Sequence, residues 1–405
     1  MEDQSIFKTL VFFVWLFIFL VDASRKFEKN IYSKTSFTSG RTTIETALSE
    51  WSITGSLLTA RAMFTSCLTP NGRVLVIGGV TGNAYKNYDR SNVGKTLRST
   101  ELYDPSSGKW TKSAAMKHSR YAHAVSLLSN GKVLVTGGDN DGESSLKTAE
   151  LYDFSTGNWT TIDDMPDCRS GHTSTVLLNG KVLTAGGWCN ASSYKKRSYL
   201  YDPSSGKWTT TGTLHMQRRG HTGTLLSNGK VLVTGGLIDE RNATKIVELY
   251  DPLTGNWTKI NSMYHARGYH TASILLDGKV LITGGTKHER THAELYDPIT
   301  ETWTITEKPM FDRAFHSASR LPNGKVLITG GYIEFQNPTK SAELYDPTTG
   351  NWTIVDNMHI NRAWHISEVL TNENVLITGG SSGDYLLAQS ELFNASTENW
   401  IHIDK

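Results

Sequence analysis

The stretch RYAHAVSLLSNGKVLVTGG at residues 120–138 decides the fold, because it recurs along the chain with fixed internal spacing. In every copy a double glycine begins 17 positions after an arginine. The seven arginines are Arg61, Arg120, Arg169, Arg218, Arg267, Arg313 and Arg362. Each copy continues into a segment similar to ELYDP, and a tryptophan lies nine positions after that segment opens. A repeat with a period near 49 residues indicates one supersecondary unit copied seven times.

Each copy predicts four short strands. The first strand, as from His123 to Leu128, runs into an Asn-Gly or Asp-Gly turn that is typical of a hairpin. The second strand is an apolar run of the KVLVTGG type, as expected of a strand buried on both faces. The third carries ELYDP, and a turn such as residues 104–108 leads to the fourth, which begins at the tryptophan. Because one such sheet cannot bury both of its faces alone, we expect the copies to stack radially into a closed ring.

The order Arg-x-x-His, Gly-Lys-Val-Leu, Gly-Gly, Glu-Leu-Tyr-Asp-Pro and Trp resembles the kelch repeat, and the resemblance covers residues 51–405. It implies an all-β fold, a seven-bladed kelch-type β-propeller with four antiparallel strands per blade. The superfamily includes the central domain of galactose oxidase. We place the propeller at residues 49–405, with the blades beginning near the seven arginines.

Some copies depart from the repeat. Phe64 replaces the histidine of the first copy, and Tyr199 replaces the glutamate of the third. A further tryptophan, Trp51, precedes the first arginine, although Trp400 already supplies an outer strand to the last copy. The sequence therefore leaves open how the ring closes.

The first 48 residues differ from the repeats. Residues 10–21 form an unbroken apolar run, which is short for a bilayer-spanning helix of about 20 residues. We predict a secretory signal peptide over residues 1–23 and a flexible leader over residues 24–48. The alternative is an uncleaved signal anchor, favoured by the acidic start and by Arg25 and Lys26, which would tie the protein to a membrane.

Six acceptor sequons for N-linked glycosylation also suit a secreted protein. Their asparagines are Asn158, Asn190, Asn242, Asn256, Asn351 and Asn394. Three cysteines are too few for a disulfide scaffold but are compatible with an oxidising compartment. Cys168 and Cys189 flank one hairpin of the third copy and are the pair that we expect, which leaves Cys67 over.

The charged and metal-binding residue types point to no cofactor. The formal charge is +2 with both signs interspersed, which gives no reason to expect a nucleic-acid partner. Histidines that recur at one position of the repeat indicate packing between units, and they are His123, His172, His221, His270, His316 and His365. Residues 288–292 have the HExxH spacing of zinc proteases, but that motif needs a helix and this segment is a short loop. We therefore predict no metal and no cofactor. We also expect the propeller to be a monomer.

The kinship with galactose oxidase implies copper radical chemistry as one alternative. That chemistry needs two tyrosines, a cysteine bonded to one of them, and two histidines at positions outside the repeat. The nearest cysteine, Cys189, is expected in a disulfide, and no complete set can be assigned.

The positions that break the repeat are the candidate binding residues. The variable loop after each double glycine shares one face of the ring, the loop face, with the connections between copies, while the opposite turn face has only tight turns. Loops on a rigid scaffold usually carry binding residues. Bulky or charged residues fall on the loop face at Trp188, Arg219, Tyr269, Phe315 and Trp364, and its longest loop, residues 80–100, contains Tyr85 and Tyr88.

These residues suggest an aromatic wall that faces a more open sector. Aromatic faces with a few polar groups suit glycans or peptides. We expect a secreted, non-catalytic binding module for a protein or a glycan. The alternative function is a secreted carbohydrate-directed enzyme, such as a galactose-oxidase-like oxidoreductase, and the alternative role of the aromatic residues is to fill space between blades.

Overall fold

The computed structural model describes residues 53–82, 94–141, 145–190, 193–286, 292–333 and 337–401. All of the described residues belong to one compact unit, Ser49–Lys405. The predicted signal peptide and leader lie outside the described residues, and so do Trp51, Tyr85, Tyr88 and residues 288–291 of the HExxH segment. The described residues form strands and turns, and none of them belongs to a helix long and apolar enough to cross a membrane.

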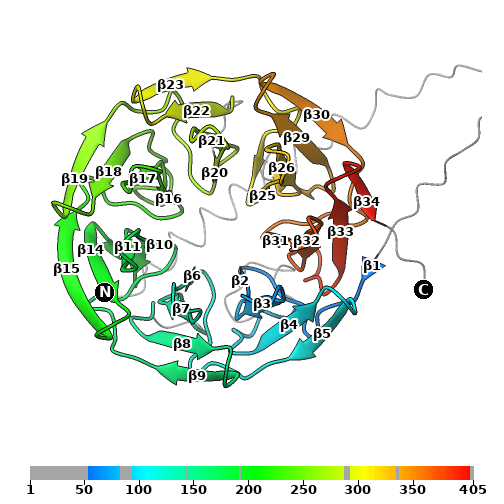
Figure 1. Ribbon diagram of the computed structural model, residues 1–405, viewed down its shortest axis with the longest axis horizontal. Coiled ribbons are helices and arrows are strands. Elements are labelled where there is room, and N and C mark those ends of the chain that lie inside the picture. Colours follow the sequence, from blue (N-terminus) through cyan, green and yellow to red (C-terminus); the bar gives the residue numbers. More distant parts are fainter. Residues whose placement is uncertain are drawn as a thin grey trace, which may run out of the picture. The chain divides into compact units, whose positions relative to one another are not determined.

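Seven large antiparallel sheets make up the described part of this unit, which confirms the all-β fold (Figure 1). We refer to each sheet as a blade and number the blades in chain order. Blade one contains β2 (Thr65–Leu68), β3 (Val74–Ile77), β4 (Thr100–Asp104) and β5 (Lys109–Lys112). Blade two contains β6 (Ala124–Leu127), β7 (Val133–Thr136), β8 (Ala149–Asp153) and β9 (Asn158–Thr161). Blade three contains β10 (Thr173–Val176), β11 (Val182–Ala185), β14 (Arg197–Asp202) and β15 (Lys207–Thr213).

The later blades repeat this order. Blade four contains β16 (Thr222–Leu225), β17 (Val231–Thr234), β18 (Val247–Asp251) and β19 (Asn256–Ile260). Blade five contains β20 (Thr271–Ile274), β21 (Val280–Thr283), β22 (Glu294–Asp297) and β23 (Thr302–Ile305). Blade six contains β25 (Ser317–Arg320), β26 (Val326–Thr329), β29 (Ala342–Asp346) and β30 (Asn351–Val355). Blade seven contains β31 (Ile366–Val369), β32 (Val375–Thr378), β33 (Ser390–Asn394), β34 (Asn399–Ile401) and β1 (Ile53–Thr54).

The blades surround an axis, with the first strand of each blade innermost and the fourth outermost (Figure 1). The first strand of each blade contacts the first strand of the next, and β31 of blade seven contacts β2 of blade one. The ring is therefore closed. Closure buries both faces of every sheet, and the second strand of each blade is buried along its whole length, as its apolar sequence predicts.

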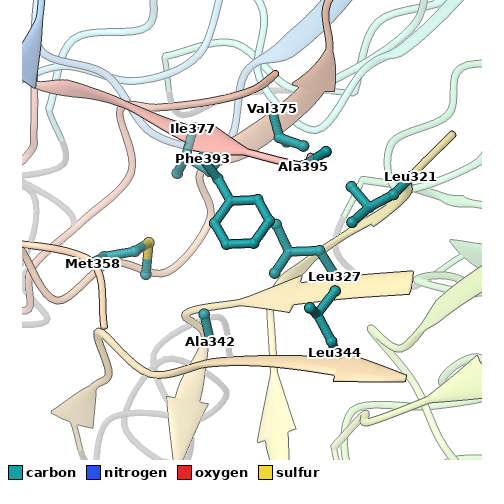
Figure 2. Packing of buried hydrophobic residues seen from close by; sticks show 9 residues of the cluster. All are labelled: Leu321, Leu327, Ala342, Leu344, Met358, Val375, Ile377, Phe393 and Ala395. Carbon is teal, nitrogen blue, oxygen red and sulfur yellow. The ribbon is translucent and has the colours of Figure 1, made fainter. Parts of the chain in front are cut away.

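The hydrophobic core lies between neighbouring blades rather than inside one of them. Figure 2 shows Leu327 and Leu344 of blade six beside Val375 and Phe393 of blade seven. Similar clusters join the other blades. A single blade would expose these side chains to water, so the apolar surface is buried only when the blades stack.

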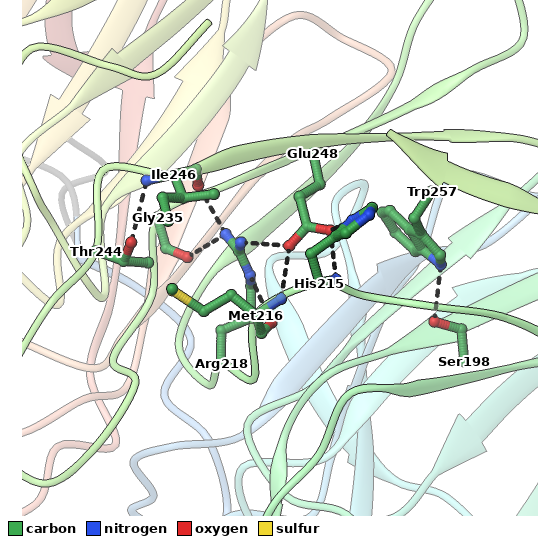
Figure 3. A network of polar contacts seen from close by, with 9 residues as sticks. All are labelled: Ser198, His215, Met216, Arg218, Gly235, Thr244, Ile246, Glu248 and Trp257. Carbon is green, nitrogen blue, oxygen red and sulfur yellow. Dashed lines mark hydrogen bonds and ion pairs between the residues drawn. The ribbon is translucent and has the colours of Figure 1, made fainter. Parts of the chain in front are cut away.

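The repeated arginine of each blade is fully buried and fastens that blade internally. In Figure 3, Nη1 of Arg218 donates to the carbonyl of Gly235, and Nη2 contacts the carboxylate of Glu248 at 2.7 Å. Every other repeated arginine makes the same bond to the first glycine of its pair, at 2.6–3.1 Å. The fixed spacing of 17 residues between arginine and double glycine follows from this bond.

The glutamate of the ELYDP segment completes the arginine clamp in six blades. The arginine and glutamate side chains lie 2.5–2.8 Å apart. In each of these blades the carboxylate also accepts a backbone N–H from the residue three positions before the arginine, at 2.6–2.7 Å. A buried ion pair needs such additional bonds to offset its desolvation. The segment that leads into each blade is thereby held to the third strand.

The second glycine of each pair joins one blade to the next. Its N–H donates to the carbonyl of the following blade's arginine at 2.8–2.9 Å, and Gly380 of blade seven donates to Arg61 of blade one. The first glycine has no room for a side chain, because a Cβ on Gly137 would lie 2.2 Å from the Arg169 carbonyl oxygen. Close approach of two blades thus requires glycine at this position.

The repeated histidines pack between blades, as their recurrence predicts. Nε2 of His172, His270 and His365 lies 2.8–3.0 Å from a threonine hydroxyl in the second strand of the preceding blade. Nε2 of His123, His221 and His316 lies 2.7–3.1 Å from a threonine hydroxyl in the first strand of the preceding blade. Burial lowers the pKa of His123, His221 and His316 to about 3. These imidazoles are therefore neutral near pH 7 and act as parts of the interface between blades.

Both ends of the described chain complete blade seven. β1 pairs with β33 through Ile53 and Thr54, and β34 pairs with the adjoining part of the same strand, from Leu392 to Asn394. Thr54 also bonds the hydroxyl of Tyr103 in blade one at 2.7 Å. The sequence left the closure open, and in the structure two short strands share the outer edge of β33.

We expect Glu248→Gln to destabilise the protein by about 3 kcal/mol or more, because it leaves the buried Arg218 without its counter-charge. Urea unfolding at neutral pH measures the change. Asp163→Asn is the matched control, since it breaks the exposed pair with Lys207 and should not shift the midpoint measurably. Equal midpoints for the two variants would contradict a stabilising role for the clamp.

Candidate functional site

A closed circle of backbone hydrogen bonds forms the mouth of the ring on the loop face. It is made by the second residue after each arginine, whose N–H donates to the carbonyl of the equivalent residue in the preceding blade at 2.7–3.4 Å. We call these residues the rim, and they are Met63, Ala122, Gly171, Gly220, Tyr269, Phe315 and Trp364. Met63 of blade one donates to Trp364 of blade seven, so the circle has no gap.

All seven rim residues have a left-handed backbone conformation, with φ between 49° and 61°. Glycine adopts it freely, but a bulky residue held there costs on the order of 1–3 kcal/mol. Tyr269, Phe315 and Trp364 nevertheless occupy it. The rim circle and the arginine two positions earlier impose the conformation, and strain of this kind is typical of functional positions. The rim therefore holds aromatic side chains in a fixed direction.

The aromatic rim residues stack on one another across three blades. The ring centroids of Tyr269 and Phe315 lie 4.6 Å apart, and those of Phe315 and Trp364 lie 5.0 Å apart. Tyr332 packs edge-on against Trp364 at 5.0 Å. We call these four residues the aromatic arc. All four are only partly buried, so they fill space between blades and also present some surface to solvent.

The small rim residues leave the adjoining sector open. The ring of Tyr269 leans over Gly220, where a Cβ would lie 2.8 Å from the aromatic carbon Cε1. A Cβ on Gly171 would meet nothing closer than 3.7 Å, the nearest atom being Cβ of Arg219. The rim is therefore uneven, with bulky residues in blades five, six, seven and one and small residues in blades two to four.

Arg219 lies beside this open sector and stacks on aromatic rings. Its guanidinium carbon is 4.2 Å from the ring centroid of Trp188 and 5.5 Å from that of Tyr194. Both tyrosines near it, Tyr194 and Tyr269, have a pKa raised by burial, and the positive charge of Arg219 opposes that rise. The structure thus brings Trp188, Arg219 and the aromatic arc to one mouth.

Tyr194 and Tyr332 belong to the mouth although their sequence positions did not single them out. Tyr332 and Trp188 directly follow the double glycine, and each pairs with the residue after its blade's arginine. Tyr194 pairs with Trp188 in a small ribbon of β12 (Trp188–Cys189) and β13 (Ser193–Tyr194). Tyr332 lies in a second ribbon, β24 (Arg313–Ala314), β27 (Tyr332–Ile333) and β28 (Asn337–Pro338). The signal that would have found Tyr332 is the irregular residue type directly after its double glycine.

Blade three, which carries Trp188, lacks the glutamate clamp. Tyr199 stands in its place, and the guanidinium of Arg169 lies over the Tyr199 ring at 4.9 Å. Burial lowers the pKa of Arg169 to about 10. Pro166, three positions before the arginine, has no N–H to donate to a carboxylate. The Tyr199 hydroxyl instead donates to Asp167 at 2.6 Å.

A disulfide holds the entry segment of blade three. It joins Cys168 to Cys189, with the Cα atoms 5.5 Å apart, while Cys67 is a free and buried thiol. Cys168 precedes the arginine, and Cys189 follows Trp188. The covalent link therefore ties the same segment that a glutamate holds in the other six blades, and it also fixes the loop that carries Trp188.

The predicted glycosylation asparagines lie at the surface. Five of the six are exposed, and Asn394 is partly buried because its side chain accepts bonds from Ser396. Asn190 and Asn242 lie in loop-face segments, whereas Asn158, Asn256, Asn351 and Asn394 lie at turns between third and fourth strands on the turn face. Glycans at the four turn-face positions would lie away from the mouth, whereas Asn190 lies only two positions after Trp188.

Comparison with known proteins supports the propeller fold. A family model described as Attractin/LZTR1 beta-propeller matches residues 92–295, and a kelch-motif model matches residues 61–117 and 315–359. No curated protein sequence matches the chain significantly.

Two solved structures share the fold at low sequence identity. A fungal alcohol oxidase of the AA5 family, in complex with copper, is 18% identical with a TM-score of 0.70, over 87% of this chain and 79% of the oxidase. The structure of YjhT is 17% identical with a TM-score of 0.54, over 70% of this chain and 97% of YjhT. At these identities the likeness shows the fold alone.

The residues that the structure describes at the mouth do not fit a copper site of the oxidase kind. Cys189 is bonded to Cys168, so its sulfur cannot bond a tyrosine ring. The repeated histidines direct Nε2 at threonines between blades. Among the described residues no group of three or more histidine, cysteine, aspartate and glutamate side chains is placed to hold a metal ion. The side chains that the structure describes at the mouth are mainly aromatic, with one cationic group, Arg219.

We expect Gly220→Ala to destabilise the protein and to displace the Tyr269 ring, because the added Cβ would overlap that ring. The loss should exceed that of Gly206→Ala by about 1–3 kcal/mol in urea unfolding. Gly206 is a matched control, since its φ is also positive and no atom lies within 4 Å of its Cβ position. A larger loss in Gly206→Ala, or an unchanged near-UV circular dichroism signal in Gly220→Ala, would show that Tyr269 does not lie over Gly220.

Removal of the disulfide tests its clamping role. Cys168→Ser with Cys189→Ser should lower the free energy of unfolding by about 2–4 kcal/mol, since the bond closes a loop with a sequence separation of 21. Hydrogen exchange at the Trp188 backbone N–H should become faster, while Gly331 in blade six stays protected. Dithiothreitol should reproduce both effects in the natural protein and add nothing to the double variant. Unchanged exchange at Trp188 would refute the role of the bond in positioning that loop.

Proposed function

Because this chain belongs to the Attractin/LZTR1 β-propeller family of kelch-repeat proteins, we propose that it is a non-catalytic binding module. Its partner is a protein or a glycan, and the binding surface is the mouth on the loop face. The observation that supports this proposal most directly is the aromatic arc, three of whose four residues the rim holds in a left-handed backbone conformation.

The composition of the mouth suits recognition. Partly buried aromatic side chains offer contact area at a low cost in conformational entropy, because each ring is already packed against its neighbours. Arg219 adds one cationic group between Trp188 and Tyr194.

We place this activity outside the cell. The predicted signal peptide, the exposed sequons and the disulfide all favour a secreted glycoprotein. If the N-terminal segment is retained, the propeller is anchored to a membrane and keeps its mouth free for the same partner. The small net charge gives no support for a nucleic-acid partner, and we propose that the propeller acts as a monomer.

The alternative function, a carbohydrate-directed enzyme, draws support from the fold that the chain shares with a copper-containing alcohol oxidase. The described side chains at the mouth favour binding instead, because they provide aromatic surfaces and a cation but no set of metal ligands. General acid–base chemistry would need a carboxylate or imidazole at hydrogen-bond distance from a substrate held there. The repeated histidines are buried between blades and cannot supply the imidazole.

A binding screen tests the proposal. The secreted protein is screened against extracellular proteins and glycans, and the hits are measured again with Trp364→Ala and Arg219→Ala. We expect a loss of affinity of at least tenfold for one or both variants, as for a residue at the centre of an interface.

Leu253→Ala serves as the control, since Leu253 is 96% exposed at a turn on the turn face. Its affinity should equal that of the natural protein. Binding that survives both mouth substitutions would place the partner elsewhere on the molecule.

A further inference from the structure

Arg219 differs from the seven repeated arginines, because its side chain has no hydrogen-bond acceptor among the described residues. Each repeated arginine donates to at least one backbone carbonyl. The side chain of Arg219 makes no hydrogen bond and no ion pair within the described part of the chain, and its Nε is buried without a partner. It is held by aromatic rings alone, at 4.2 Å and 5.5 Å from their centroids.

The acidic residues around this sector do not contact the guanidinium. Asp239 and Glu240 influence the nearby Tyr194 electrostatically, and Asp139 influences Tyr269. Oδ1 of Asp239 already accepts the backbone N–H groups of residues 241 and 242 at 2.8 Å. The planar donor fork of Arg219 is therefore oriented by stacking and left unpaired, and carboxylates match such a fork with two parallel hydrogen bonds.

We propose that the mouth binds a sugar acid, that is, a pyranose ring that carries a carboxylate. This inference rests on the proposed function and names its ligand class. The carboxylate pairs with the outer nitrogens of Arg219, and the C–H faces of the sugar ring lie on the aromatic arc. Tyr269 connects Arg219 with the aromatic arc, because its ring lies over Gly220, the residue that follows Arg219.

The backbone of the mouth favours a sugar over an acidic peptide. Peptides commonly bind by adding a strand to free backbone N–H and C=O groups. Here the rim groups are used in the closed circle, and Arg219 and Leu237 exchange both of their backbone bonds. Trp188 and Ser170 do the same. Recognition is left to side-chain faces and one cation, which suits a ring with an apolar face and a charged edge.

Calorimetric titration of the secreted protein tests this inference with two probes. One is a tetramer of a hexuronic acid, and the other is its methyl ester, which keeps the sugar faces and removes the charge. We expect the acid to bind roughly tenfold to a hundredfold more tightly than the ester, as for a charge-assisted pair. Arg219→Ala should reduce binding of the acid to the level of the ester and change binding of the ester by less than about twofold.

Two further variants separate this pair from general effects. Arg219→Lys keeps the charge but loses the planar fork, so it should recover only part of the affinity. Arg73→Ala removes an arginine from a turn on the turn face and should bind both probes as the natural protein does.

The remaining outcomes distinguish this inference from the proposed function. If the acid and the ester bind equally and both need Trp364, the mouth is a glycan site and the carboxylate pairing is wrong. If a glutamate-rich peptide binds through Arg219 and neither sugar does, the ligand class is wrong while the binding module stands. If Arg219→Ala weakens the binding of the acid and of the ester equally, Arg219 has a structural role in the mouth and does not recognise the carboxylate.

Discussion

The backbone and side chain of each repeated arginine make the two contacts on which the ring depends. The guanidinium binds the carbonyl of the first glycine in its own blade, and the arginine carbonyl accepts the N–H of the second glycine from the blade before. The repeated arginine thus fixes the internal geometry of its own blade and the distance to the neighbouring blade. Because the groups are fully buried, any change in spacing would leave a charge or a carbonyl without a partner, which is costly.

The candidate site follows from the same geometry. Two residues after the arginine the chain must turn across the mouth, and all seven blades make that turn in the left-handed conformation. The backbone conformation there is the same in all seven blades, although the side chains differ. Glycine in blades three and four opens a sector, whereas aromatic residues in blades five to seven build a wall. The arginine that holds the fold and the rim residue that varies between blades lie two positions apart in the chain.

Much of the fold and part of the candidate site could be predicted from the sequence, because the fold depends on residues that recur. The fixed distance from Arg218 to Gly235 predicted the unit, and the uneven rim was visible at Gly220 and Tyr269. The left-handed backbone of the rim and the stacking of Arg219 could not be predicted, since both depend on contacts between distant segments that no local sequence pattern indicates. Tyr194 was missed because its place is set by a short ribbon and a disulfide in a variable loop.

Native-state hydrogen exchange at the second glycine of each pair tests most directly whether one closed circuit holds the ring together. The relevant amides are those of Gly79, Gly138, Gly187, Gly236, Gly285, Gly331 and Gly380. A closed ring predicts that all seven exchange through a single global unfolding reaction, with one common free energy. Exchange of Gly380 through a separate opening of much lower free energy would contradict the account, because it would show that blades seven and one part while the others stay folded.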